Sequence, residues 1–323
     1  MLGAIIGDIV GSRWEFNRTN DYNFEWLSDE NGFTDDTICT IAVADALLHG
    51  SDDYGKYIHE WCNRYPHPMG GYGGRFAKWV HSDNPQPYGS FGNGSAMRVS
   101  PIGMWFDNRE EVLEHAKKSA ECSHNHPEGI KGAQTVALAI FKAHSYHRYQ
   151  EAPMHIDEIL SECVQFSGYD INMPKSSVMN KFDETCQGTV PVALKIISMA
   201  TCFEDAVRMA VSLGADADTL GAITGSIAEA IWGIPNKIRH RIENYLPSEM
   251  LSVLHYFHYI RPRSYKPLID TCFSGKDFND ISWDMLYDVD GKDVCNRIKK
   301  NTEDENKQKR RLMVERAKAR ENW

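Results

Sequence analysis

Two short acidic stretches of the chain combine aspartates with a threonine directly before an apolar run of helical character. In FTDDT, Thr34 precedes Asp35 and Asp36, and the apolar run begins at Ile38. Threonine is a favourable N-cap residue, and the helix dipole favours carboxylates in the first turn of a helix. This stretch is therefore either an ordinary capped helix start or a set of oxygen ligands for a metal ion.

The second stretch is GADADTLGAITG, in which Asp216, Asp218 and Thr219 precede a helix rich in glycine and alanine. If the two stretches converge, four carboxylates face one another, and they repel strongly unless cations lie between them. Mg²⁺ prefers hard oxygen ligands, which carboxylates and threonine hydroxyls supply without histidine or cysteine. Convergence therefore predicts a site for two Mg²⁺ ions, with Mn²⁺ as an alternative metal, and disfavours zinc.

A third acidic segment, GDIVGSRWEF, lies near the start of the chain. Asp8 and Glu15 are seven residues apart, which is two helical turns, so they share one face if the segment is helical. Either carboxylate can equally be a solvated surface group. This motif alone therefore does not separate a functional role from a structural one.

The segments that must position these carboxylates are mostly helical. Apolar residues recur with helical spacing in residues 37–50 and 136–145, and alternating strand-like runs are scarce. Gly and Pro punctuate residues 66–76, 84–95, 125–132 and 232–237, which marks loops between helices. Residues 1–260 show no linker-like change in composition, so we expect one all-α domain there.

The C-terminal residues 261–323 differ from this domain and are expected to form an extension. Residues 261–291 have loop-like composition, and a charged, helical segment follows from Asp293. Residues 297–323 hold ten Lys or Arg against five Asp or Glu, a net +5 that leaves −15 on the rest of the chain. This net basic tail is either a solvated helix that packs loosely on an acidic body or a contact arm.

The overall composition excludes several classes of protein. With 42% hydrophobic and 25% charged residues and a net charge of −10, the chain is typical of a soluble globular protein, and nucleic acid is not an expected partner. No stretch of about 18 apolar residues occurs, so we expect no membrane span. The eight cysteines form no C-x-x-C pair. Scattered thiols of this kind favour a cytoplasmic location.

Five motifs occur in one order along residues 2–235: GDIVGSRWEF, FTDDT, GNGSAMR, SHNHPEG and GADADTLGAITG. Together they resemble the ADP-ribosylglycohydrolase family, which includes the dinitrogenase-reductase-activating glycohydrolases and the animal ADP-ribosylhydrolases. The resemblance implies a compact orthogonal bundle of α-helices with a dinuclear Mg²⁺ site at the bottom of a cleft. Residues 261–323 lie outside the resemblance.

The resemblance also implies roles for individual residues. The implied metal ligands are Thr34, Asp35, Asp36, Asp216, Asp218 and Thr219. The implied catalytic residues are Glu15, Asp35 and Asp218, with Glu15 contacting a metal or its water near the scissile ribose. The implied substrate-binding residues are Gly92, Asn93, Gly94, Ser95, Met97 and His124.

Within GNGSAMR, glycines let backbone N–H groups approach a diphosphate, and Asn93 is expected to hold a ribose hydroxyl. GGYGGRF, residues 70–76, is a less specific candidate for closing over the cleft, and His126 is interpreted as structural. The chain departs from the family pattern at Ala215, which leaves all ligands in place. It departs again at Ser90, where some arginine-directed members carry a carboxylate, so the identity of the modified residue stays open.

The implied function is Mg²⁺-dependent hydrolysis of the glycosidic bond between ADP-ribose C1″ and a modified acceptor, which reverses mono-ADP-ribosylation. The partner is then an ADP-ribosylated protein or a small-molecule ADP-ribose conjugate. One alternative is a non-catalytic immunity or regulatory protein that binds ADP-ribose or an ADP-ribosylating toxin. Another is a two-metal phosphohydrolase, which would release AMP instead of ADP-ribose.

Overall fold

Fourteen α-helices and two short 3₁₀ helices form the regular structure of the described residues, in a computed structural model. The structure describes residues 1–149, 155–260, 315, 319, 320 and 323. No strand occurs in this part of the chain, where Gly92 and Thr185 make one isolated β-bridge. The expected all-α architecture is therefore confirmed for the described residues.

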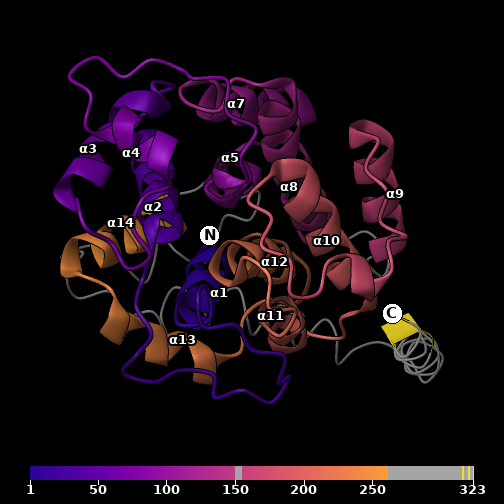
Figure 1. The fold of residues 1–323 in the computed structure, drawn as a ribbon. Helices are drawn as coiled ribbons and strands as arrows, with labels where there is room; N and C mark the ends of the chain where they lie inside the picture. Colours follow the sequence, from indigo (N-terminus) through magenta and orange to yellow (C-terminus); the bar gives the residue numbers. More distant parts are fainter. Residues whose placement is uncertain (150–154, 261–314, 316–318, 321–322) are drawn as a thin grey trace, which may run out of the picture.

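A central pair of helices, α1 (Leu2–Ser12) and α12 (Ala217–Trp232), carries two of the acidic motifs. Every residue of α1 is buried, and so are almost all residues of α12. Figure 1 places this pair in the middle, with α2 (Asp35–Leu48) on one side and α8 (Pro127–Tyr149) and α10 (Cys186–Met199) on the other. The apolar run of residues 136–145 lies within α8, and the run of residues 37–50 lies in α2 up to Leu48, where the helix ends.

The other helices surround this centre. They are α3 (Tyr54–Arg64), α4 (Gly74–Val80), α5 (Gly94–Met97), α6 (Ser100–Trp105), α7 (Arg109–Glu121), α9 (Ile156–Ser167), η1 (Lys175–Ser177), α11 (Phe203–Val211), α13 (Asn236–Ile242), η2 (Glu243–Tyr245) and α14 (Ser248–Ile260). Their inward faces form one hydrophobic core with the central helices. No helix in the described ranges is long and apolar enough to cross a bilayer.

Glycines set the unusually close approach of α1 and α12. A Cβ added at Gly7 would lie 2.0 Å from the backbone oxygen of Gly221, and one at Gly3 would lie 2.3 Å from that of Gly225. Gly11 meets the backbone of Ala217 in the same way. Because residues four apart share a helix face, these glycines form a stripe along which the two backbones touch.

The expected division into a domain of residues 1–260 and an extension of residues 261–323 remains a prediction. Apart from residues 315, 319, 320 and 323, the extension lies outside the described residues. The dinuclear metal cleft likewise remains a prediction at the level of the fold.

Candidate functional site

The first acidic motif begins helix α2, as its sequence predicts. Thr34 is the N-cap, and its hydroxyl accepts a hydrogen bond from the Asp36 N–H at 3.2 Å. Asp35 and Asp36 occupy the first turn. Asp36 is buried, whereas Asp35 keeps partial exposure. The local capping expected from FTDDT is therefore present, and it holds both carboxylates at one end of the helix.

The Asp8 carboxylate of α1 binds this end of α2 through hydrogen bonds. Its buried carboxylate accepts from the Thr34 N–H at 3.0 Å and from the Thr34 hydroxyl at 2.8 Å. It also accepts from the Thr37 N–H at 3.1 Å and from the Thr37 hydroxyl. Burial, then the nearby charge of Asp218, raises the pKa of Asp8 to about 7, while the bonds from the threonines lower it. Asp8 therefore acts as a support for Thr34.

Asp8 and Glu15 were expected to share a face if the segment is helical, and that condition is not met at Glu15. Helix α1 ends at Ser12, and the Arg13 guanidinium donates to the Glu25 backbone oxygen at 2.6 Å and to the Ser28 hydroxyl at 2.7 Å. These non-local bonds join the chain just beyond the helix to the loop that follows. Glu15 therefore lies in a turn beyond the helix, and its direction is set by the loop.

The second acidic motif begins helix α12, with Asp216 as N-cap and Asp218 in the first turn. The Thr219 hydroxyl donates to Asp36 Oδ2 at 3.0 Å, which joins the starts of α2 and α12 directly. Asp218 Oδ1 and Asp36 Oδ1 are both buried without a hydrogen-bond partner. Two unpartnered carboxylate oxygens in one buried cluster are costly unless a cation fills the gap.

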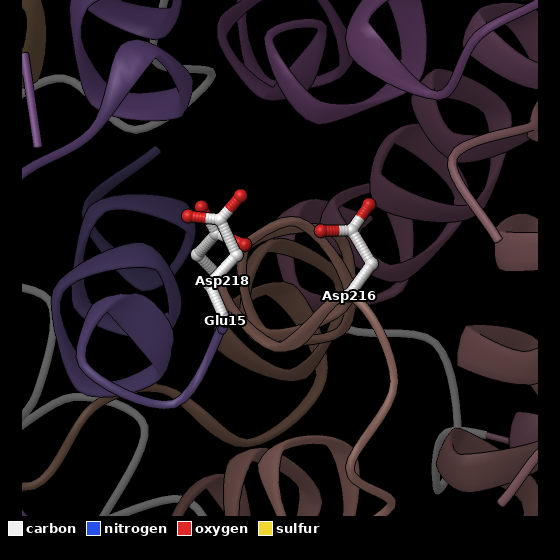
Figure 2. A group of neighbouring side chains, drawn as sticks. All are labelled: Glu15, Asp216 and Asp218. Carbon is white, nitrogen blue, oxygen red and sulfur yellow. The ribbon is translucent and has the colours of Figure 1, made fainter. Parts of the chain in front are cut away.

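Glu15 completes this cluster. Carboxylate oxygens of Glu15, Asp216 and Asp218 all lie within 4.8 Å of one another. Figure 2 shows the three carboxyl groups pointing to the same side of the start of α12. Three carboxylates from two distant parts of the chain thus meet at a spacing compatible with shared cations or with water between them.

The electrostatics of the cluster are those of crowded acids. Burial is the largest influence, followed by the charges of Asp218, Asp35 and Asp8, and together they raise the pKa of Glu15 to about 9. Burial, then the charge of Asp218, also raises the pKa values of Asp35 and Asp36 well above the ordinary value. The same two influences, in the same order, raise the pKa of Asp216. Bound cations would lower these pKa values again, because a nearby opposite charge favours the ionised carboxylate.

The donor set fits a hard divalent cation. It offers only oxygen atoms, from carboxylates and threonine hydroxyls, and two of its buried oxygens lack partners. The carboxylate oxygens that the structure brings within 4.8 Å of one another belong to Glu15, Asp216 and Asp218. The ligand set Thr34, Asp35, Asp36, Asp216, Asp218 and Thr219 remains a prediction. An oxygen-only donor set is the chemistry of a Mg²⁺ or Mn²⁺ site rather than of a zinc site.

The glycine-rich motif lies against the cluster through Asn93. The Asn93 Nδ2 group donates to Asp216 Oδ2 at 2.7 Å and to the Thr189 hydroxyl at 3.1 Å. Its backbone N–H donates to the Glu184 oxygen at 2.7 Å, and the Gly92 N–H donates to the Ser90 hydroxyl at 3.2 Å. The backbone N–H groups of Gly92 and Asn93 therefore already have partners within the protein. If this motif binds the diphosphate through its backbone, we expect Gly94 and Ser95 to make the contacts.

Among the other residues expected to bind substrate, Ser95 and Met97 are buried, and Gly94 lies against His124. The Ser95 hydroxyl is buried and donates to the Gly129 oxygen at 2.7 Å, and the Met97 side chain is buried in the core. A Cβ added at Gly94 would lie 3.1 Å from His124 Nε2. His124 is buried, and burial followed by the charges of Arg98 and Arg75 lowers its pKa well below the ordinary value. A neutral imidazole therefore packs directly on the glycine-rich motif.

The segment GGYGGRF reaches the cluster at Glu15. Gly70 has φ +75°, and a Cβ added there would lie 2.5 Å from Glu15 Oε2. The Tyr72 hydroxyl donates to the backbone oxygens of Cys62 at 3.0 Å and Tyr65 at 2.7 Å, which anchors the segment on α3. The backbone at Gly70 thus covers the carboxylate of Glu15.

His126, expected to be structural, accepts from the Glu128 N–H at its Nδ1.

Sequence reasoning missed three features of the site. It did not assign Thr37 as a partner of Asp8, Asn93 as a partner of Asp216, or Glu184 as a carboxylate whose charge acts on Glu15. The repeat of glycine at every fourth residue in α1 was a visible signal for close helix packing. The sequence around Glu184 contains no motif that would indicate its proximity to Glu15.

Comparisons with known proteins agree with the motifs. A family model described as ADP-ribosylglycohydrolase matches residues 1–264. ADP-ribosylhydrolase ARH3 of Bos taurus is 25% identical over a match that covers 78% of this chain and 90% of that protein. ADP-ribosylarginine hydrolase Tri1 of Pseudomonas putida (strain GB-1) is 24% identical, covering 72% of this chain and 70% of that protein.

A solved structure supports the fold independently. An ADP-ribosylglycohydrolase-related protein complex aligns with a TM-score of 0.61 at 24% identity, covering 81% of this chain and 96% of that chain. At this identity the likeness establishes the fold alone. The family match, which spans most of the chain and all five motifs, confirms the resemblance. This chain therefore belongs to the ADP-ribosylglycohydrolase family.

Proposed function

We propose that this protein is a Mg²⁺-dependent hydrolase that cleaves the glycosidic bond between ADP-ribose C1″ and a modified acceptor. Family membership and the names of its relatives support ADP-ribosyl hydrolysis. The observation that carries the metal dependence is the meeting of the two Asp-Thr motifs, with Asp36 Oδ1 and Asp218 Oδ1 buried and unpartnered. Two ions, Mg²⁺ or Mn²⁺, would balance this much negative charge.

The metal ligands in this proposal are the six residues named above, held by the starts of α2 and α12. Bound ions would supply Lewis acidity toward the sugar hydroxyls and toward an attacking water. The protein itself fixes the ligands, because Asp8 holds Thr34 and Asn93 holds Asp216. Such supporting bonds orient ligands and raise their affinity for metal.

Glu15 is the proposed general base or water-positioning residue, with Asp35 and Asp218 also close to the chemistry. Its carboxylate lies beside Asp216 and Asp218 and under the Gly70 backbone. With cations held by its neighbours, the Glu15 carboxylate would be ionised at neutral pH and could take a proton from the water that attacks C1″. Loss of one such base costs on the order of 10²- to 10⁴-fold in rate.

The substrate is proposed to be an ADP-ribosylated protein or a small-molecule ADP-ribose conjugate. His124, Gly94 and the neighbouring residues of GNGSAMR are the proposed contacts for the ADP-ribose moiety. Tri1 is named for ADP-ribosylarginine, whereas the name of ARH3 states no acceptor. Assays with defined conjugates of different acceptor residues therefore identify the acceptor.

Product analysis tests this proposal. EDTA-treated protein is incubated with defined mono-ADP-ribosylated peptides, with and without Mg²⁺, beside the Asp218→Asn variant. Release of free ADP-ribose that requires both Mg²⁺ and Asp218 is the expected result. AMP as product would instead indicate a phosphohydrolase. Tight ADP-ribose binding with no product from any conjugate would favour a non-catalytic immunity or regulatory protein.

A further inference from the structure

The basic C-terminal tail makes a specific contact with the acidic body. Arg320 Nη1 lies 2.9 Å from Asp205 Oδ1, and its guanidinium stacks over the Tyr22 ring at 4.4 Å from the centroid. Asp205 belongs to α11 and is almost fully buried. Its Oδ1 also accepts from the Tyr22 hydroxyl at 2.6 Å. A guanidinium paired with a buried carboxylate makes a stronger, more directional contact than surface ion pairs do.

Trp323 makes a second contact on a different segment. Its indole Nε1 donates to the Met173 backbone oxygen at 3.1 Å, and Lys175 Nζ lies 5.7 Å from the centre of its ring. The ring also packs against the edge of the hydrophobic core. Both tail residues therefore bind to the body through polar groups and aromatic faces, in the described part of the extension.

Besides Asp205 in α11, the tail contacts two loops. Tyr22 lies in the α1–α2 loop, residues 13–34, and Met173 and Lys175 lie in the α9–α10 segment, residues 168–185. The loops also touch directly, but at the surface. The exposed Phe16 stacks on Phe182 with ring centroids 6.0 Å apart, and Arg18 donates to the Asn180 oxygen at 2.8 Å. Exposed contacts of this kind hold a loop weakly. Partly buried bonds at α11 also hold the α1–α2 loop, because Asn20 Nδ2 donates to the Ser212 oxygen at 3.1 Å and Arg208 Nη1 donates to the Phe24 oxygen at 2.9 Å.

The same two loops carry parts of the candidate site. Glu15 precedes Phe16 in the α1–α2 loop, and the Glu184 backbone oxygen in the α9–α10 segment binds the Asn93 N–H. Because Glu15 lies outside any helix, its position over Asp216 and Asp218 depends on how the loop is held. Arg320 contacts the first of these loops at Tyr22 and Trp323 contacts the second at Met173, so the tail links the two loops.

We propose that Arg320 and Trp323 are positioning residues, which hold the α1–α2 loop and the α9–α10 segment so that Glu15 stays over Asp216 and Asp218. This inference rests on the proposed function, in which Glu15 handles a proton near C1″. It assigns to the basic tail a role as an internal contact arm. The metal ligands of α2 and α12 are held independently by Asp8 and Asn93.

The test compares full-length Arg320→Ala and Trp323→Ala with Glu315→Ala, an exposed residue of the same tail. In the first two variants, hydrogen exchange at residues 14–22 and 173–184 is expected to accelerate. Their kcat should fall by roughly 10-fold, since misplacing a catalytic group by about 1 Å can cost 10²-fold. The half-saturating Mg²⁺ concentration should not change. Arg320→Lys should recover part of the rate, and Glu315→Ala should match the parent protein.

Parent-like exchange at both loops together with an unchanged kcat would overturn the proposal. A lower thermal midpoint with parent-like exchange and kcat would also overturn it, because the tail would then only stabilise the fold. If the parent protein hydrolyses no conjugate, the proposed function fails. Exchange at residues 14–22 still decides whether the tail holds the loop that carries Glu15.

Discussion

The Thr219 hydroxyl donates to Asp36 Oδ2 at 3.0 Å, across 183 positions of sequence. This one bond brings the first turns of α2 and α12 together. It also leaves the other oxygen of Asp36 buried and unpartnered. A hydroxyl that bridges two acidic motifs can act both as a support for a carboxylate and as a ligand in its own right.

Thr219→Val should weaken metal binding with little effect on packing, since valine replaces the hydroxyl by a methyl group of similar size. We expect the half-saturating Mg²⁺ concentration to rise by roughly 10- to 100-fold, the usual cost of losing a supporting group. Thr224→Val is the matched control on the same helix, because the buried Thr224 hydroxyl has no hydrogen-bond partner. Equal Mg²⁺ dependence in the two variants would refute the assignment of Thr219.

Asp218→Asn should separate activity from stability. Hydrolysis should fall by roughly 10²-fold or more, since a group close to the chemistry is lost. The metal-free protein should melt higher, because Asp218 raises the pKa of Asp8, Glu15, Asp35 and Asp36. A gain of about 1 kcal/mol corresponds to a rise of about 2–4 °C. Asp29→Asn, at an exposed carboxylate, should change neither quantity.

The metal-free protein should lose stability as pH rises. The pKa of Asp8 is raised from 3.8 to about 7, and that of Glu15 from 4.5 to about 9. The folded state therefore binds protons more tightly than the unfolded state, so this stability is complete below about pH 4 and is lost toward pH 7 and 9. Thermal midpoints in EDTA should fall from pH 5 to 8.5. With saturating Mg²⁺ the thermal midpoint should depend less on pH. A midpoint in EDTA that rises with pH would contradict the raised pKa values of Asp8 and Glu15.

Gly94→Ala should weaken ADP-ribose binding through His124. The new Cβ would lie 3.1 Å from His124 Nε2, so the ring must shift. Loss of one buried polar contact corresponds to roughly 1–3 kcal/mol, while Mg²⁺ binding should be nearly unchanged. Calorimetry measures both ligands, and the Gly94→Ala and His124→Ala effects should be non-additive. If Gly74→Ala alone weakens ADP-ribose binding, GGYGGRF would be the diphosphate segment.

Gly7→Ala should destabilise the whole fold. A Cβ there would lie 2.0 Å from the Gly221 backbone oxygen, which cannot move without separating α1 from α12. Overpacking of this kind costs about 1–3 kcal/mol in the free energy of unfolding. Gly74→Ala is the control, because its Cβ meets no atom within 4 Å. Its unfolding free energy should be unchanged or higher by up to about 1 kcal/mol.

The helical fold and the family could be read from the sequence because they depend on short-range features. Thr34 caps α2 and the carboxylates of Asp35 and Asp36 fill its first turn, as the order of residues in FTDDT predicts. Asp216 and Asp218 likewise stand at the start of α12, although the Asp216 side chain makes no capping bond and accepts from Asn93 instead. Capping and helical periodicity involve residues only three or four positions apart, so the chain displays them without its tertiary structure.

Tertiary structure alone decided which of these groups meet. The contact of Asp36 with Thr219 requires α1 and α12 to pack backbone to backbone, and that depends on glycines whose partners are more than 200 positions away. Glu15 lies beyond the end of α1 at Ser12, in a loop that Arg13 joins to Glu25 and Ser28. Its position over Asp216 and Asp218 follows from loop contacts that no local pattern encodes. The residue types thus predicted an oxygen-rich metal site. Long-range packing determined which of these side chains lie together.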